Sequence, residues 1–387
     1  MTSTTSPAFV AELPTPIARL AEGVELLDPV DAPPLRWGIL GAGHIARRFA
    51  REVPAHTRST IAAVGARELS RAQVFADELA IERAHGSYAD LIADPDVDAI
   101  YLATINSTHR DLALACIRAG KPVLVEKPFA LNAAETRDVF AAAEEHGVLV
   151  VDGMWTRFLP QFTVARQIAA NGLLGRLVTA HANFAGIMHA PVPRIVDVEQ
   201  GGGALLDIGV YSIAAVHDLL GPPVEVAAAG NLLPGYAVDG SASVIMRTAS
   251  AVGTARCSFE GRAPSRAEFV FERGVVELPA EFFVPGMLRV SEFDRDGSEQ
   301  ASDESTDGVS GALTTEWDAT VPGGFQFEAA EFARLLTSGS TQSPVMPWQA
   351  SIEIMEVLDQ ARAAIGVVYP GKPPRREASL GWSLSPA

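Results

Sequence analysis

The stretch LRWGILGAGHIARRFA near the N-terminus constrains the fold more than any other part of the chain. An apolar run leads into Gly41 and Gly43, and Ala46 follows in a segment with helical spacing, so the pattern is G-x-G-x-x-A. Gly41 permits a tight turn, Gly43 lets another group approach the backbone, and Ala46 allows close packing of helix on strand. The first helical residues, His44 and Ile45, would face a pyrophosphate. The pattern predicts a strand, turn and helix that bind a dinucleotide, whereas a glycine turn without a ligand is the alternative.

The surrounding sequence favours the dinucleotide site. Short apolar runs alternate with Ala-rich helical segments over residues 35–151, which predicts βαβ units and a Rossmann domain with a parallel sheet. After Trp155, helices expected at 160–171 and 204–220 are followed by strand-like pieces separated by turn signals. This order predicts a second, α+β domain over 152–370 with a large, mostly antiparallel open sheet. The whole chain is therefore expected to be α/β.

The remaining segments are expected to be peripheral. Residues 1–34 are rich in Pro, Thr, Ser and Ala and predict an N-terminal arm or a disordered leader. The acidic stretch 291–311 predicts an exposed hairpin and loop. Helices are expected at 326–337 and 348–365, and 371–387 is interpreted as a C-terminal tail.

Charge and cysteine content exclude several classes of partner. The formal charge of −17 disfavours binding to nucleic acid or to an anionic membrane surface. No basic, apolar leader of the secretory type opens the chain, so a cytoplasmic location is expected. Cys116 and Cys257 lie in apolar runs without a CxxC spacing, which indicates buried thiols in a reducing compartment and no metal site.

The end of the second strand, in AAVGARELSRA, indicates which dinucleotide is preferred. An acidic residue there would bond the ribose 2′-hydroxyl of NAD, whereas an arginine would accommodate the 2′-phosphate of NADP. Arg67 occupies this position and Glu68 follows directly. The sequence favours NADP, with NAD as the alternative. A solvated helix start is the other explanation for Arg67 and Arg71.

The stretch KPVLVEKPFALN places Glu126 and Lys127 where an apolar strand ends, and Pro128 follows. Ligands of open parallel sheets bind outside the carboxyl edge, so Lys127 is expected to face the cofactor rather than to be ordinary surface charge. The fingerprint followed by EKP resembles the Gfo/Idh/MocA oxidoreductases over about residues 35–368. The segment 87–128, then WTRFLP and GGGALLDIGVYS, are similar to the dimeric dihydrodiol dehydrogenase branch, which includes NADP-dependent pentose dehydrogenases.

The resemblance has several implications for the fold and the site. It implies a cis Lys-Pro bond and an open sheet that forms the contact in a homodimer or homotetramer. It implies that Thr104, Asn106 and His109 line the nicotinamide side of the cofactor, and that Trp155 and Arg157 lie near the nicotinamide or substrate. Capping of the helix that begins near His109 by Asn106 and Thr108, and inter-domain packing by Trp155, are the alternatives.

The glycines of GGGALLDIGVYS precede Asp207 and Tyr211, which lie four residues apart and share one face of the expected helix. Removing a hydroxyl proton as hydride leaves carbon needs a base, and Tyr211 is the candidate proton acceptor and donor. The ammonium of Lys127 and an oxidised nicotinamide would favour its phenolate, and Asp207 would orient Lys127 or the substrate. Many relatives carry His in place of Tyr211, so Lys127 itself is the other candidate. Dipole stabilisation by Asp207 and core packing by Tyr211 are the non-catalytic explanations.

These features together predict an NAD(P)-dependent dehydrogenase that acts on a secondary alcohol or hemiacetal of a sugar, polyol or cyclic diol. The alternatives are an NAD-dependent glycosidase of the same fold and a non-catalytic dinucleotide-binding regulator. Arg194 is a further candidate substrate contact, although surface charge explains it equally well.

Overall fold

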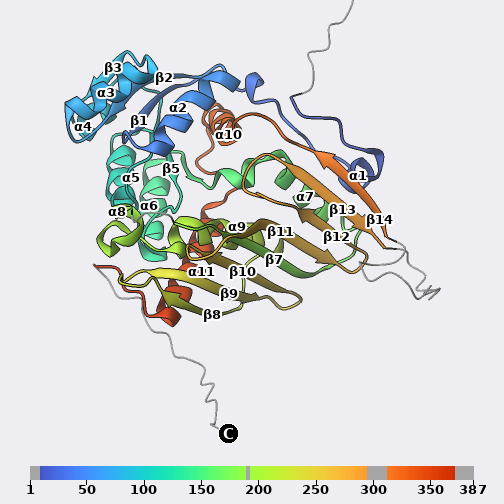
Figure 1. Ribbon diagram of the computed structural model, residues 1–387. Coiled ribbons are helices and arrows are strands. Elements are labelled where there is room, and N and C mark those ends of the chain that lie inside the picture. Colours follow the sequence, from blue (N-terminus) through green and yellow to red (C-terminus); the bar gives the residue numbers. More distant parts are fainter. Residues whose placement is uncertain (1–8, 189–191, 294–311, 371–387) are drawn as a thin grey trace, which may run out of the picture.

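The computed structural model describes residues 9–188, 192–293 and 312–370, and these form two sheets that lie side by side (Figure 1). The first sheet has six strands in the order β3-β2-β1-β4-β5-β6, and every pair is parallel. Its strands are β1 (Arg36–Leu40), β2 (Thr60–Gly65), β3 (Arg83–His85), β4 (Ala99–Leu102), β5 (Val123–Glu126) and β6 (Val150–Gly153). The predicted Rossmann sheet is confirmed.

Helices connect the parallel strands, as right-handed crossovers between parallel strands require. They are α2 (His44–His56), α3 (Leu69–Leu79), α4 (Tyr88–Ile92), α5 (His109–Arg118) and α6 (Ala133–His146). The strand order reverses between β1 and β4. In open parallel sheets a crevice lies at such a switch point, beyond the carboxyl ends of the strands. The glycine turn follows the end of β1, and the EKP motif lies at the end of β5, so the candidate residues of both motifs lie at this edge.

The second sheet has eight strands in the order β14-β13-β12-β11-β7-β10-β9-β8. Its pairs are antiparallel except for β7 with β10. The strands are β7 (Leu177–Ala185), β8 (Glu225–Leu232), β9 (Asp239–Arg247), β10 (Val252–Ser258), β11 (Ala263–Phe271), β12 (Gly274–Leu278), β13 (Met287–Glu292) and β14 (Leu313–Asp318). The mostly antiparallel open sheet predicted from the sequence is confirmed.

Helices cover one face of this sheet. α9 (Val210–Leu220) contacts β7 and β10, α11 (Trp348–Ile365) contacts β8, and α7 (Pro160–Asn171) contacts β13 (Figure 1). α11 also contacts α6, and α10 (Phe325–Ser338) contacts α2, so both join the two domains. The central strands alternate buried and more exposed positions, as expected for a sheet covered on one face.

Strand β7 has no clear signal in the sequence. Its buried positions are Ala180 and Ala182, and polar or small residues occupy most of the others, so no bulky apolar alternation marks it. Its strand conformation comes from pairing with β10 and β11 in the middle of the sheet. Strand β13 ends inside the stretch 291–311 that was expected to form a hairpin and loop, and 294–311 lie outside the described residues.

The described part of the N-terminal arm, residues 9–34, packs against this chain. Its helix α1 (Thr15–Leu20) contacts α7 and β14, and Ile17 and Leu20 are fully buried. The Trp317 indole N–H donates to the Ala11 carbonyl at 2.8 Å, and the Arg334 guanidinium donates to the Asp28 carbonyl at 2.8 Å. The alternative of a disordered leader is therefore wrong for residues 9–34, because apolar side chains of the arm complete the core. The tail 371–387 lies outside the described residues.

The helix expected at 204–220 consists of a π-helical turn, Leu205–Gly209, followed by α9. The stretch Val198–Leu220 has the length and apolar content of a membrane span, but most of it is buried inside the protein. It is a core helix, whose apolar character comes from contact with the sheet and neighbouring helices on several sides.

Candidate active site

A cavity of about 300 Å³ lies at the carboxyl edge of the parallel sheet and extends to α9 of the second domain. Residues from five sequence segments line it: the glycine turn, the end of β2, the loop after β4, EKP and GGGALLDIGVYS. The lining residues are Gly41, Ala42, Gly43, His44, Ile45, Ala66, Arg67, Arg71, Tyr88, Ala103, Thr104, Ile105, Asn106, Thr108, Glu126, Lys127, Arg194, Asp207 and Tyr211.

The glycine turn has the shape of a phosphate cradle. Gly41 has φ +106°, and a Cβ there would lie 2.5 Å from the Ala103 carbonyl oxygen, so only glycine fits. A Cβ at Gly43 would meet no protein atom closer than 4.0 Å, so this glycine is open toward the cavity. His44 and Ile45 begin α2, whose N-terminal amides are available to an anion. These residues fit the pyrophosphate of a dinucleotide.

Two arginines and a tyrosine line the end of the cavity beyond β2. Arg67 and Arg71 are exposed, and Tyr88 begins α4 on the other side. Arg67 follows the end of β2 and lines the cavity, which is where the sequence-based prediction of an NADP site requires an arginine. Tyr88 could not be predicted as a site residue, because an aromatic residue at a helix start carries no distinguishing signal until β3 is folded beside β2.

The loop after β4 contributes Thr104 and Asn106 to the cavity. The Thr104 hydroxyl shares a hydrogen bond of 2.7 Å with the Thr108 hydroxyl. The Asn106 side-chain amide donates to the Gly201 carbonyl at 3.0 Å, which joins the loop to the second domain. In the described structure the capping alternative for Asn106 is wrong, because no side chain caps α5.

His109 is buried and is not among the described residues that line the cavity. Its Nδ1 lies 2.9 Å from the Pro128 carbonyl oxygen and its Nε2 lies 3.2 Å from the Thr104 carbonyl oxygen. Burial lowers the pKa of His109 despite these carbonyl contacts. The ring therefore ties the EKP strand to the loop after β4 and supports the cavity wall from behind.

The EKP segment places an acid and an amine at the end of β5. Tyr101 donates its hydroxyl proton to one carboxyl oxygen of Glu126, and the backbone N–H of Lys127 donates to the other at 3.0 Å. Burial raises the pKa of Glu126, although Lys127 and Tyr101 oppose this. The Lys127-Pro128 bond is cis, as the resemblance implies.

Lys127, Asp207 and Tyr211 meet across the two domains. Lys127 Nζ donates to the Asp207 backbone carbonyl at 2.7 Å and lies 3.7 Å from the Asp207 carboxylate. The same Nζ lies over the Tyr211 ring, 4.5 Å from its centroid, in cation–π contact. Arg194 donates to the Asp207 carboxylate at 2.9 Å and also lines the cavity.

The protonation states of this group follow from burial and charge. Burial disfavours the ammonium of Lys127, but Tyr211, Asp207 and Glu126 together raise the pKa of Lys127 above its ordinary value. Burial also favours the neutral acid of Asp207, yet Lys127 and Arg194 hold the pKa of Asp207 below its usual range. At neutral pH the amine is an ammonium and the acid a carboxylate.

Without a cofactor, Tyr211 is not the phenolate that its neighbour Lys127 was expected to favour. Burial raises the pKa of Tyr211 and outweighs the opposing effect of Lys127. The charge of Lys127 acts with the predicted sign, but burial of Tyr211 and the nearby charge of Glu126 act against it. Tyr211 is therefore a neutral phenol at neutral pH.

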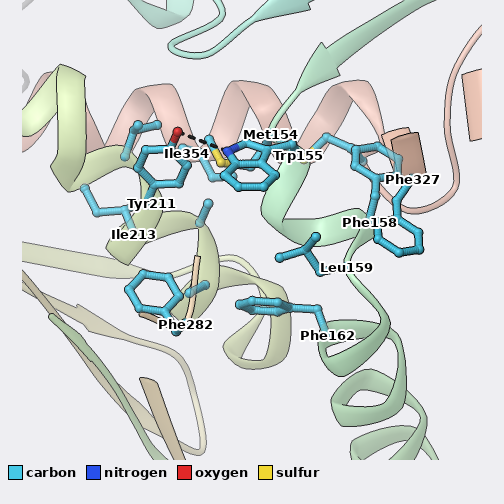
Figure 2. Packing of buried hydrophobic residues seen from close by; sticks show 14 of the residues in the cluster. Met154, Trp155, Phe158, Leu159, Phe162, Tyr211, Ile213, Phe282, Phe327 and Ile354 are labelled. Atoms are coloured by element: carbon cyan, nitrogen blue, oxygen red, sulfur yellow. Dashed lines mark hydrogen bonds between the residues drawn. The ribbon is translucent and has the colours of Figure 1, made fainter. Parts of the chain in front are cut away.

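Trp155 and Arg157 lie behind the cavity rather than in its described lining. The Trp155 indole N–H donates to the Tyr211 hydroxyl at 3.1 Å, and the ring packs within the core, so Trp155 combines domain packing with contact to the candidate proton donor (Figure 2). The Arg157 guanidinium lies 2.9 Å from His217 Nδ1 and 3.6 Å from the Asp218 carboxylate. The structure thus places Arg157 in a buried ion pair with Asp218 of α9, outside the described lining of the cavity.

Comparisons with known proteins match this architecture. Residues 35–154 match the oxidoreductase family with an NAD-binding Rossmann fold, and 162–277 match the GFO/IDH/MocA C-terminal domain. Trans-1,2-dihydrobenzene-1,2-diol dehydrogenases from Mus musculus and Homo sapiens are each 33% identical over 341 and 342 residues, covering 87% of this chain and 98% of each relative.

Solved structures share the fold at lower identity. A 3-ketoreductase from Actinomadura kijaniata, solved with NADP and TDP-benzene, is 24% identical with a TM-score of 0.72, over 86% of this chain and 98% of that one. Levoglucosan dehydrogenase, solved with NADH and levoglucosan, is 19% identical with a TM-score of 0.71, over 86% and 98%. Both family models agree with the two-domain fold, and together with the diol dehydrogenase relatives they show that the chain belongs to the GFO/IDH/MocA family of oxidoreductases.

Proposed function

We propose that this protein is an NADP-dependent dehydrogenase acting on a secondary alcohol or hemiacetal of a sugar, polyol or cyclic diol. The observation that carries the proposal is the meeting of Lys127, Asp207 and Tyr211 in the cavity that the glycine turn also lines. The diol dehydrogenase relatives support a hydroxyl-bearing substrate. When bound, the nicotinamide would accept a hydride from the substrate carbinol carbon, and residues of the protein would have to take up the hydroxyl proton.

The proposed proton partners are Tyr211 and Lys127. Both groups keep their protons at neutral pH, because the pKa of each is above its ordinary value. In this state they can donate to a carbonyl oxygen. For alcohol oxidation Tyr211 Oη has to lose its proton first, so the oxidation rate is expected to rise with pH. Asp207 orients Lys127 through its carbonyl, and Arg194 holds the Asp207 carboxylate.

The proposed cofactor site follows the cavity. Gly41, Gly43 and the start of α2 would hold the pyrophosphate, and Thr104 and Asn106 would lie beside the nicotinamide half. Arg67 at the end of β2 supports NADP over NAD, because a guanidinium forms charge-assisted hydrogen bonds with a phosphate.

A substrate panel tests the proposal. Aldoses, inositols and cyclic diols are each assayed with NADP and NAD by the absorbance of the reduced nicotinamide. Net NADP reduction with at least one class, faster than NAD reduction, is the expected result. If the protein binds a dinucleotide but no class of substrate reduces it, the protein would be a regulator. Glycoside cleavage without net reduction would indicate a glycosidase, and either outcome would overturn the proposal.

Assembly and location belong to the same proposal. The face of the eight-stranded sheet opposite α9 and α11 is uncovered within the described chain, and we propose it as the contact of a homodimer or homotetramer. Cys116 and Cys257 are buried and free, which fits a reducing, cytoplasmic compartment.

A further inference from the structure

A buried carboxyl group lies next to the glycines that precede Asp207. Asp239 begins β9 and is 0% exposed. Its Oδ2 accepts a hydrogen bond of 2.6 Å from the backbone N–H of Leu205, the first residue of the π-helical turn. Its Oδ1 has no hydrogen-bond partner among the residues that the structure describes. Asp239 therefore satisfies an amide at a helix start that lies 34 positions earlier in the chain.

The backbone of the glycine segment is shaped around this carboxyl. Gly203 has φ +114°, and a Cβ there would lie 2.3 Å from Asp239 Oδ1. The adjacent Gly202 carbonyl accepts a hydrogen bond from the Tyr369 hydroxyl, and Arg362 lies 4.4 Å from the centroid of the Tyr369 ring. Side chains from β9 and from the end of the described chain thus fix the start of the turn.

The same turn carries the oxygen that holds the candidate catalytic amine. The Asp207 carbonyl accepts from Lys127 Nζ at 2.7 Å, and the Asp207 amide donates to the Gly203 carbonyl at 3.2 Å. Leu205 and Asp207 belong to one π-helical turn, and Tyr211 follows in α9. A shift of the Leu205 amide would therefore move the Lys127 acceptor and the Tyr211 ring together.

We propose that Asp239 is a positioning residue, whose carboxylate anchors the Leu205 amide and thereby sets where the Asp207 carbonyl holds Lys127 against Tyr211. Asp239 is absent from the described lining of the cavity, so it acts through the turn and not on a ligand. A carboxylate suits this place because the N-terminal amides of a helix favour negative charge. The kinetic consequence rests on the proposed dehydrogenase function, whereas the effect on Lys127 does not.

Matched variants separate positioning from general stability. Asp239→Ala removes the acceptor, and Asp239→Asn keeps an oxygen that can accept from Leu205. Asn132→Ala is the control, because Asn132 caps α6 by accepting from the Glu135 amide at 2.9 Å and is not part of the described cavity lining. Its loss removes a helix cap without touching the turn.

The reactivity of Lys127 provides a readout that needs neither substrate nor cofactor. The chain has only three lysines, Lys121, Lys127 and Lys372, so competitive acylation with acetic anhydride and peptide mapping resolves each one. In Asp239→Ala we expect the acylation rate of Lys127, relative to Lys121, to rise about fivefold or more. In Asp239→Asn and in Asn132→Ala we expect the acylation rate of Lys127, relative to Lys121, to stay within about twofold of its value in the original protein.

Steady-state kinetics of the full-length enzyme add the second readout. In Asp239→Ala we expect kcat to fall about tenfold or more while the KM for NADP stays within about twofold, with recovery of most of kcat in Asp239→Asn. Unchanged Lys127 reactivity in folded Asp239→Ala, or an equal loss of kcat in Asn132→Ala, would overturn the inference.

Two further outcomes are distinguishable. If the original protein reduces no dinucleotide, the proposed function fails, and the acylation readout still decides the role of Asp239. If Asp239→Ala does not fold, Tyr369→Phe replaces it, because this variant loses only the hydrogen bond to the Gly202 carbonyl. A rise of about threefold or more in Lys127 acylation would then support anchoring of the turn, and a change within about twofold would contradict it.

Discussion

Replacing Lys127 by Met removes the positive charge that lies over the Tyr211 ring. The two groups are 4.5 Å apart, from Nζ to ring centroid. With this separation taken as the scale for the distance between the ammonium and the phenolate charge, and an effective dielectric of about 20, the ammonium favours the phenolate by roughly 4 kcal/mol, or about 3 pH units. The pKa of Tyr211, already raised by burial, should rise further by up to this amount when the ammonium is lost.

The measurement is the pH dependence of kcat/KM for alcohol oxidation. With Lys127→Met, the alkaline rise should shift to higher pH by about 2 to 3 units, so that the rate near neutrality falls roughly 10²- to 10³-fold. Lys127→Arg keeps a charge and should shift the rise far less, even if its maximum rate is lower. Lys121→Met, which removes an ammonium bonded to the Asp94 and Val97 carbonyls, controls for general destabilisation. An unshifted rise in folded Lys127→Met would refute the electrostatic argument.

Three further predictions concern the cofactor site and the core. Gly43→Ala should leave the melting temperature unchanged but weaken dinucleotide binding about tenfold. In Gly41→Ala the backbone is strained and the new Cβ would lie 2.5 Å from the Ala103 carbonyl oxygen, so the free energy of unfolding in urea should fall by roughly 2 kcal/mol or more. Arg67→Ala should weaken NADP binding roughly 10- to 100-fold and NAD binding less than about threefold, as measured by nicotinamide fluorescence. Burial raises the pKa of Asp152 to about 7, so the folded state binds more protons than the unfolded state between about pH 4 and 7, and stability is lost as pH rises through this window. Asp152→Asn should remove this loss, which amounts to roughly 3 kcal/mol between pH 5 and pH 8, when the free energy of unfolding is compared at these two pH values.

The fold was predictable where the local sequence pattern favours the same conformation that the tertiary structure adopts. The glycine turn, the buried strands before Gly41 and Glu126, and the regular helices of the first domain all follow from short-range periodicity and steric rules. Strand β7 was not predictable, because its alternation uses alanines and its place in the sheet depends on partners about 70 to 90 residues away.

The site was predictable as a set of motifs but not as a geometry. The residues of the glycine turn, Lys127 and Tyr211 could be named from the sequence, yet the position of the ammonium over the ring depends on packing between domains. The direction of the Tyr211 pKa shift depends on burial, which the sequence does not state. Asp239 and the π-helical turn carry no local signal, since the carboxyl meets the Leu205 amide only after β9 has joined the sheet.

The central claim is that Tyr211 handles the proton at the reacting oxygen, and single-turnover kinetics of Tyr211→Phe test it most directly. With the best substrate of the panel at saturation, the rate of nicotinamide reduction should fall roughly 10²- to 10⁴-fold while the NADP dissociation constant stays within about threefold. Trp155→Phe removes the indole donor to the Tyr211 hydroxyl but keeps that hydroxyl, so its rate of nicotinamide reduction should fall far less than that of Tyr211→Phe. A Tyr211→Phe rate within about threefold of the original enzyme would contradict the account.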